Sequence, residues 1–122
     1  MKATKKQMKM IGRLQRRPEF LRVNKEGRKW VSKSLILLVA PNEQEQTRFG
    51  LTVTKKVSKS AVVRNRIRRR LRAAAYDILP NLAKPGQDYV LIGRVETETR
   101  SYEDITGDLR WCLKKMELLK ND

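Results

Sequence analysis

The sequence predicts a single small domain in which helices pack on a β-sheet. Its 122 residues, 39% of them apolar, suit one compact domain with a modest core. Strand-like segments at 34–40 and 48–56 precede an amphipathic helical segment at 61–79. No internal repeat or Pro/Gly/Ser-rich linker divides the chain. We therefore expect a basic, flexible N-terminal tail over residues 1–17 and one folded domain over residues 18–120.

The first expected elements are a short helix and two strands. The helix begins at Pro18, a residue favoured at the first helical position, and stops at Gly27. The run "SLILLVA" at 34–40 is continuously apolar, which is typical of a strand covered on both faces. The segment "RFGLTVTKK" at 48–56 alternates strictly and predicts a strand with one core face. Its core face holds Phe49, Leu51 and Val53, and its other face holds Gly50, Thr52, Thr54 and Lys56.

The C-terminal part predicts one more strand and one more helix. The strand is "DYVLIGR" at 88–94, and the helix covers 101–119. Ser101 and Asp104 have the spacing of a capping box at the start of this helix. Cys112 falls in its apolar stripe, so we expect a small buried hydrophobe rather than a reactive thiol.

Segment 61–79 predicts a helix with an apolar stripe and an arginine-rich remainder. The stripe comprises Val63, Ile67, Leu71, Ala74 and Ile78. Six arginines occupy the nine positions from 64 to 72 without an acidic residue. Solvated helix faces usually interleave acids, because like charges four residues apart destabilise a helix by a few tenths of a kcal/mol. We infer that a bound polyanion relieves this repulsion, and that guanidinium forks are used because they grip phosphate oxygens bidentately.

Two arginines occupy the borders of the apolar stripe. Arg64 lies in the direction of Leu71 and Ala75, so we expect its side chain to be held by its surroundings. Arg70 lies on the opposite border, where we expect it to swing freely into solvent. Arg64 should therefore contribute more than Arg70 to binding of the polyanion.

Composition and charge narrow the function further. The net charge is +16, with 22 Lys and Arg against four acids in residues 1–76 and seven against nine in residues 77–122. Such asymmetry favours a phosphate-binding side, and nucleic acid is the expected polyanion. Histidine is absent, which excludes catalysis by imidazole, and a single cysteine cannot form an internal disulfide. Without a secretory signal or an apolar stretch of ~18 residues, the expected location is the cytoplasm, with no membrane partner.

The motif "GLTVTKK" followed by "AVVRNRIRRRLR" resembles the protein subunit family of bacterial ribonuclease P. "EFLRVNKEG" before the first long strand and "DYVLIGR" before the last helix extend this resemblance from Arg13 to Leu118. The resemblance implies an α+β fold with a central mixed sheet of about four strands. It also implies a left-handed βαβ crossover, which runs against the general rule for such connections.

The resemblance further implies an endoribonuclease that removes the 5′ leader from precursor tRNA. In this family the catalytic RNA subunit supplies the active site and binds the Mg²⁺ ions. The protein binds that RNA and the leader, and itself carries no catalytic residue, metal or small-molecule cofactor. The implied partners are the catalytic RNA subunit and precursor tRNA.

Matching positions give two expected sets of site residues. The RNA-binding set comprises Arg64, Asn65, Arg66, Arg68, Arg69 and Arg72. The leader-binding cleft comprises Phe20, Thr52, Thr54, Lys56, Val90 and Ile92. Asn24 and Leu38 stand where many relatives have cleft aromatics, and the loop at 58–60 is one residue longer and lacks a glycine at Ser58.

Other classes of protein remain as alternatives. A structural RNA-binding protein of ribosomal type explains the charge and size equally well, but not the ordered motifs. A DNA-binding module lacks a helix-turn-helix partner for the basic helix. A stand-alone protein nuclease would need clustered carboxylates for metal ions, and the dense acids Glu96, Glu98, Glu103 and Asp104 lie outside the basic region.

Overall fold

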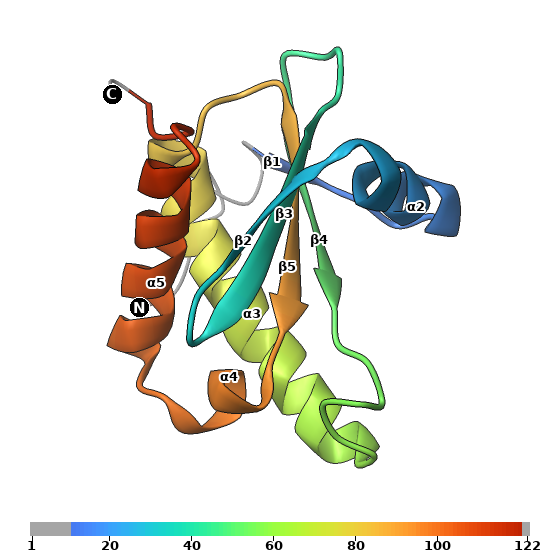
Figure 1. Cartoon of the computed structure of the whole chain (residues 1–122), viewed down its shortest axis with the longest axis vertical. Coiled ribbons are helices and arrows are strands. Elements are labelled where there is room, and N and C mark those ends of the chain that lie inside the picture. The colour runs from blue at the N-terminus through green and yellow to red at the C-terminus, as the bar shows by residue number, and fades with distance from the viewer. Residues whose placement is uncertain (1–10, 121–122) are drawn as a thin grey trace.

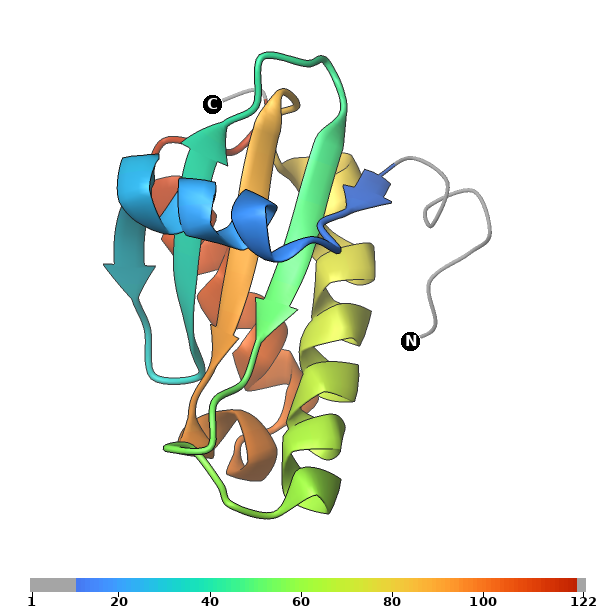
Figure 2. The same ribbon diagram turned by 90° about the vertical axis from the view of Figure 1, so that its right-hand side faces the viewer.

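The computed structural model, which describes residues 11–120, contains one five-stranded mixed sheet with helices on both faces (Figure 1). The strand order is β1-β4-β5-β3-β2. The strands are β1 (Ile11–Arg13), β2 (Arg28–Val31), β3 (Leu35–Pro41), β4 (Thr47–Thr52) and β5 (Gln87–Gly93). The helices are α2 (Arg17–Glu26), α3 (Ala61–Leu82), α4 (Val95–Thr99) and α5 (Tyr102–Lys115). Helices α3 and α5 cover one face of the sheet, and α2 crosses the other (Figure 2).

The connection from β4 to β5 has the unusual hand that the resemblance implies. The two strands are parallel neighbours, with Phe49 opposite Tyr89 and Leu51 opposite Leu91, and α3 joins them. In Figure 2 both strands run downward, β5 lies to the left of β4, and α3 lies behind the sheet. This arrangement is a left-handed crossover, whereas about 98% of such connections are right-handed.

The main core lies between the sheet and helices α3 and α5. The predicted stripe of α3 is confirmed, since Ile67, Leu71, Ala74 and Ile78 are buried there and Val63 packs against them. The predicted helix cap is also confirmed, with the Ser101 hydroxyl accepting a hydrogen bond from the Asp104 N–H at 3.0 Å.

The cysteine of α5 takes the structural role expected for it. Cys112 is fully buried in the main core. Burial raises the pKa of its thiol to about 11, so the thiolate is scarce near neutral pH.

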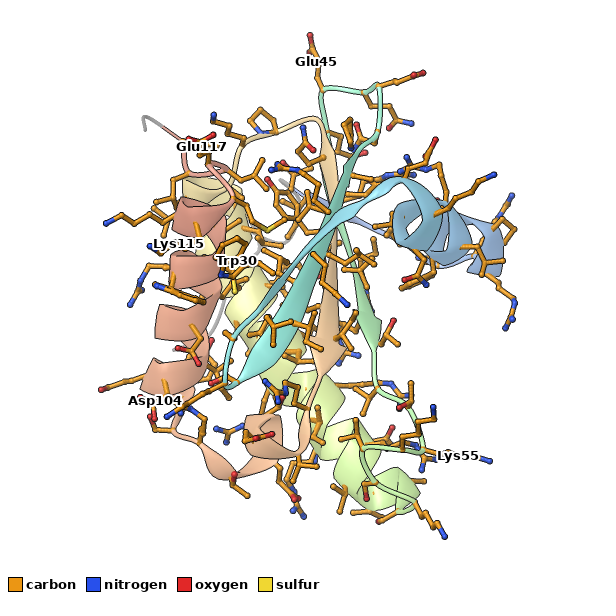
Figure 3. The ribbon with its side chains drawn as sticks, viewed as in Figure 1. Trp30, Glu45, Lys55, Asp104, Lys115 and Glu117 are labelled. Carbon is orange, nitrogen blue, oxygen red and sulfur yellow. The ribbon has the colours of Figure 1, made fainter. Side chains whose placement is uncertain are left out.

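Two short strands depart from the sequence prediction. The sheet begins at Ile11, within the segment expected as a tail, because residues 11–13 pair in parallel with β4 and bury Ile11 and Leu14. Residues 1–10 of that expected tail lie outside the described residues. Strand β2, which was not predicted, completes a sheet of five strands rather than about four. Its four residues are all exposed, and Trp30 points from it toward α5 (Figure 3).

The strand predicted over 48–56 is shorter than expected. Strand β4 ends at Thr52, and a turn follows in which the Val57 N–H donates to the Thr54 carbonyl at 3.1 Å. Thr54 and Lys56 are therefore exposed in a loop beyond the strand rather than on its face.

A buried carboxylate attaches α2 to the sheet. Both oxygens of Asp88, on β5, accept hydrogen bonds from Arg48 on β4, at 2.8 Å from Nε and 2.7 Å from Nη2. Arg22 of α2 also donates to Asp88, and Asn42 Nδ2 donates at 2.9 Å. Glu19 of α2 lies 3.0 Å from Arg48 Nη1. Two side chains of α2 therefore reach one ion-pair network on the sheet.

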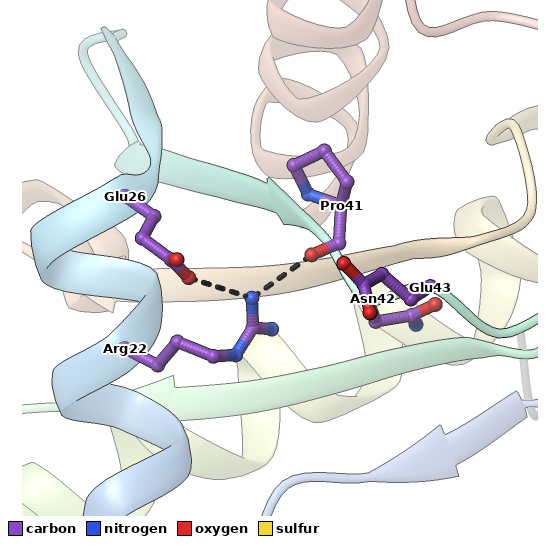
Figure 4. A pocket seen from close by; sticks show the side chains of 5 residues that line it. All are labelled: Arg22, Glu26, Pro41, Asn42 and Glu43. Atoms are coloured by element: carbon purple, nitrogen blue, oxygen red, sulfur yellow. Dashed lines mark hydrogen bonds and ion pairs between the residues drawn. The ribbon is translucent and has the colours of Figure 1, made fainter.

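The same network extends along α2 toward the loop after β3. Arg22 Nη1 donates to Glu26 at 3.1 Å and to the Pro41 carbonyl at 2.9 Å (Figure 4). A single guanidinium thus ties the last turn of α2 to the end of β3.

The pKa values of Asp88 and Glu19, two acids of the network, are both lowered. Burial by itself would raise the pKa of Asp88, but hydrogen bonds from Arg48, Asn42 and Arg22 hold it below the ordinary value. The pKa of Glu19 is lowered mainly because the Arg16 backbone N–H donates to its carboxylate. Both acids are therefore charged across the neutral range.

We expect Asp88→Asn to lower the free energy of unfolding near neutral pH by about 1.5–3 kcal/mol, because two partly exposed guanidinium groups lose charged hydrogen bonds to the carboxylate between them. The folded state holds the pKa of Asp88 below its ordinary 3.8. Its contribution is therefore complete above that pH and is lost as the pH falls through the folded-state value. Urea unfolding of wild type and variant from about pH 7 to about pH 2 measures both effects. A stability difference that does not shrink in acid would contradict this role for the charge.

Candidate nucleic-acid interface

Helix α3 presents its arginines from a firmly anchored N-terminus. The Ser60 hydroxyl caps the helix by accepting from the Val63 N–H at 3.3 Å. The preceding loop, whose shape the sequence left open, is closed by a bond from the Ser60 N–H to the Ser58 hydroxyl at 3.2 Å. Arg64 Nη1 donates to the Ser58 carbonyl at 2.9 Å, so this arginine is held in place as expected.

The arginines of α3 differ in how they are held. Arg68 donates to Asn65 Oδ1 at 3.0 Å and to the Val53 carbonyl at 3.4 Å, which turns it toward the end of β4. Arg66 pairs with Glu98 of α4 at 2.7 Å. Arg69 is exposed, and its guanidinium makes no hydrogen bond or ion pair with the residues that the structure describes.

The prediction that Arg70 swings freely in solvent is wrong. Its guanidinium donates to the carbonyl of Arg100, between α4 and α5, and the side chain is half-buried. Arg70 therefore links α3 to the chain segment after α4.

Four of the six residues expected to bind RNA share one hollow. It measures about 440 Å³ and is lined by Val62, Asn65, Arg68, Arg69 and Arg72. Three guanidinium groups around a shallow, open depression can contact several phosphate oxygens at once. Of the remaining two expected residues, Arg64 turns toward the loop before α3 and Arg66 toward α4.

The opposite face of the sheet is only partly covered by α2 (Figure 2). Phe20 lies directly over Gly50, where a Cβ atom would come within 2.5 Å of the ring. Leu38 and Val90, in the same cross-strand row as Gly50, are buried beneath α2. Leu38 is 5% exposed, so it supports α2 and does not present itself to a ligand.

The next row lies beyond α2 and remains open. Thr52 pairs with Ile92, Ile92 with Ile36, and Ile36 with Val31. The first three are half-buried, and Val31 is exposed. This row, which we call the open row, is the surface of the expected leader cleft.

The residues expected in the cleft are therefore only partly brought together. Phe20, Thr52 and Ile92 lie at or beside the open row, and Thr54 and Lys56 follow in the loop. Val90 was expected on the cleft wall but is 2% exposed, because α2 covers it. Asn24 is exposed on α2.

Two kinds of feature are absent from residues 11–120. No cluster of three or more acidic or cysteine side chains in this part of the chain could hold a metal ion. None of its helices is both long enough and apolar enough to cross a bilayer.

The fold and its arginine surface define a small α+β nucleic-acid-binding protein. The model of the ribonuclease P family matches residues 8–117. The ribonuclease P protein component of Paramagnetospirillum magneticum is 44% identical over 115 residues, which cover 90% of this chain and 86% of that protein. The corresponding protein of Gluconacetobacter diazotrophicus is 46% identical over 104 residues, covering 84% and 89%. The chain therefore belongs to the ribonuclease P family, as a protein component.

A solved structure agrees with this assignment. The RNase P protein from Thermotoga maritima superimposes with a TM-score of 0.73 at 27% identity, covering 84% of this chain and 96% of that one. The fold expected from the resemblance is thus confirmed.

Arg69 and Arg70 are neighbours for which we expect different outcomes. Arg69→Ala should reduce the slope of log affinity for RNA against log salt by about 0.7–0.9, the loss of one phosphate contact. Arg70→Ala should instead lower the free energy of unfolding by about 1.5 kcal/mol, because its charged hydrogen bond lies within the fold. RNA titrations at several salt concentrations, together with urea unfolding, measure both. Equal slope changes with unchanged stability would show that the helix acts only as diffuse charge.

Proposed function

We propose that the exposed face of α3 binds the catalytic RNA subunit of ribonuclease P, while the open row of the sheet holds the 5′ leader of precursor tRNA. The assembly removes the leader to give the mature 5′ end, in the cytoplasm. The observation that carries the proposal is the loop at 53–60, which joins the end of β4 directly to the start of α3. The two surfaces therefore adjoin, so that the catalytic RNA and the leader can lie side by side.

The chemistry of α3 supports its assignment to the structured RNA. Arginines dominate its exposed face, and those at 64 and 68 are already directed by hydrogen bonds. Planar forks at fixed positions suit the phosphates of a folded RNA better than mobile lysines do. The RNA contacts proposed here are Arg64, Asn65, Arg66, Arg68, Arg69 and Arg72.

The open row supports a single-stranded ligand. Its centre is aliphatic, through Ile92 and Ile36, and the ring of Phe20 lies at its edge. Lys56 is exposed in the loop at the β4 end, where it can meet a phosphate. Apolar side chains that bases can pack on, next to cations, are the usual components of a site for single-stranded nucleic acid.

The described acids support placing the chemistry and its Mg²⁺ ions on the RNA subunit. Asp88 is enclosed by arginines, and Glu98 pairs with Arg66. Asp77 accepts a hydrogen bond from the Tyr102 hydroxyl at 2.5 Å. These carboxylates are used to hold the fold and do not converge at the arginine surface. The protein would then act by binding and positioning RNA.

Reconstitution with the cognate catalytic RNA tests this function. Precursor tRNA should be cleaved at its 5′ end at low Mg²⁺ concentration only when RNA subunit and protein are both present. Cleavage by the protein alone would contradict the assignment of the chemistry. RNA binding without any effect on cleavage would favour a structural RNA-binding role of ribosomal type.

We expect the protein to tighten binding of precursor tRNA but hardly that of mature tRNA, which has no leader. Phe20→Leu keeps an apolar side chain over Gly50 but removes the ring, and should reduce that difference by about 1–3 kcal/mol, the range for one stacked base. Phe20→Tyr, which keeps a ring, is the matched control. Both affinities are measured with the assembled holoenzyme. Equal tightening of precursor and mature tRNA by the wild-type protein would refute the leader site and leave α3 as an RNA-binding surface.

A further inference from the structure

A second hollow lies at the β2 edge of the sheet. It measures about 440 Å³ and is lined by Val31, Ser32, Lys33, Arg94, Asp108 and Trp111. Single exposed apolar residues are ordinary on protein surfaces. Here, however, Val31 is 48% exposed, Trp111 is 42% exposed, and Trp30 beside them is 37% exposed. Three large apolar side chains are thus partly exposed at the β2 edge.

The tryptophan in this hollow is held in a fixed orientation. The rings of Trp111 on α5 and Trp30 on β2 meet edge to face, with centroids 6.0 Å apart and planes at 65°. Trp30 lies between β2 and α5 (Figure 3). An indole ring braced in this way and still accessible can stack on a planar ligand with little loss of side-chain freedom.

The charges around the hollow favour an anionic ligand. Lys33 is exposed, and its ammonium group makes no hydrogen bond or ion pair within residues 11–120. Arg94 is positioned by donating to the Ser32 carbonyl at 2.5 Å, with its Nε 3.9 Å from Glu96. Two cations therefore line a site that also contains an accessible indole.

The negative charge of Asp108, the acid that lines the hollow, is offset by a backbone N–H and by an arginine. Asp108 accepts from the Ser34 N–H at 3.0 Å and lies 3.8 Å from Arg100 Nη2. A second copy of a chain with a net charge of +16 would be repelled from this surface, whereas a polyanion would be attracted.

The hollow continues the open row of the sheet. Val31 is the last residue of that row and also lines the hollow. With strands ~4.8 Å apart, the row from Thr52 on β4 to Val31 on β2 spans about 14 Å. A single strand of RNA that follows the row therefore reaches Val31 at the β2 edge, where Trp111 of α5 lines the hollow from the other side of the sheet.

We propose that this hollow is a nucleotide-binding subsite, in which a base stacks on Trp111 beside Val31 and a phosphate lies near Lys33 and Arg94. The identification of this RNA as the distal part of the 5′ leader rests on the proposed function. The binding of a nucleotide in the hollow does not, since it follows from the local geometry and charge.

Tryptophan fluorescence tests the subsite directly, because Trp30 and Trp111 are the two tryptophans of the chain. Full-length protein is titrated with a short single-stranded oligouridylate that carries a fluorophore, and its anisotropy reports total binding. In the Trp30→Phe variant, the Trp111 signal should change saturably with the same midpoint as the anisotropy. Trp111→Ala should weaken binding about tenfold and Trp111→Phe much less, as expected for a stacked base. Lys33→Ala should lower the affinity for oligouridylate and make that affinity less dependent on salt. Lys25→Ala, on α2, is the control for the loss of one surface lysine.

Three outcomes would overturn the subsite. Oligouridylate binding without a change in the Trp111 signal, and with unchanged affinity in Trp111→Ala, would place the RNA elsewhere. Absence of any binding would leave the hollow without its proposed ligand. In the third outcome, the protein does not bind oligouridylate, and its mass in solution rises with protein concentration unless Trp111 is replaced by alanine. The hollow would then be a contact between copies of the chain.

Holoenzyme assays then separate the subsite from its assignment to the leader. Trp111→Ala should weaken binding of a precursor tRNA with a long leader several-fold. It should not change the affinity for a precursor tRNA whose leader is too short to extend beyond the open row. The Trp111 fluorescence could respond to oligouridylate while the effect of Trp111→Ala does not depend on leader length. That result would support the subsite and refute its assignment to the leader.

Discussion

The carboxylate of Asp88 is the interaction on which both faces of the sheet depend. It lies at the start of β5 and binds Arg48 of the neighbouring strand and Arg22 of α2. Because α2 buries only a small apolar cluster, this polar contact fixes where the helix crosses the sheet. The position of α2 in turn decides which cross-strand row is covered and which is open. An ion pair far from the arginine helix thus sets the width of the surface proposed for the leader.

The sequence predicted those parts of the fold whose patterns are periodic and long. The stripe of α3, the buried run of β3 and the cap at Ser101 follow from residue spacing alone. Strands β1 and β2 have three and four residues, and neither carries an alternating pattern. They form because β4 and β3 offer them backbone partners, which is tertiary information. The handedness of the crossover likewise came only from the family resemblance.

The candidate site, like the fold, could be predicted from the sequence only in part. Helical geometry identified which arginines of α3 leave the core, but not what each one meets. Glu98 and the carbonyl of Arg100 come from α4 and the residue after it, so the different roles of Arg66 and Arg70 were not readable from α3 itself. The family resemblance assigned Val90 to the cleft wall but could not show that α2 covers it in this chain. Trp30 and Trp111, distant in sequence, meet only in the folded chain.

The hydrogen bonds of Arg64 and Arg68 have a thermodynamic consequence for recognition. A free arginine side chain gives up roughly 2 kcal/mol of rotamer entropy when it is immobilised. At these two positions, backbone carbonyls and Asn65 already restrict the guanidinium groups in the free protein. Much of that loss is therefore incurred during folding rather than during association. RNA would meet a partly rigid template, and a mismatched phosphate spacing would be rejected because these side chains do not readily rearrange to follow it.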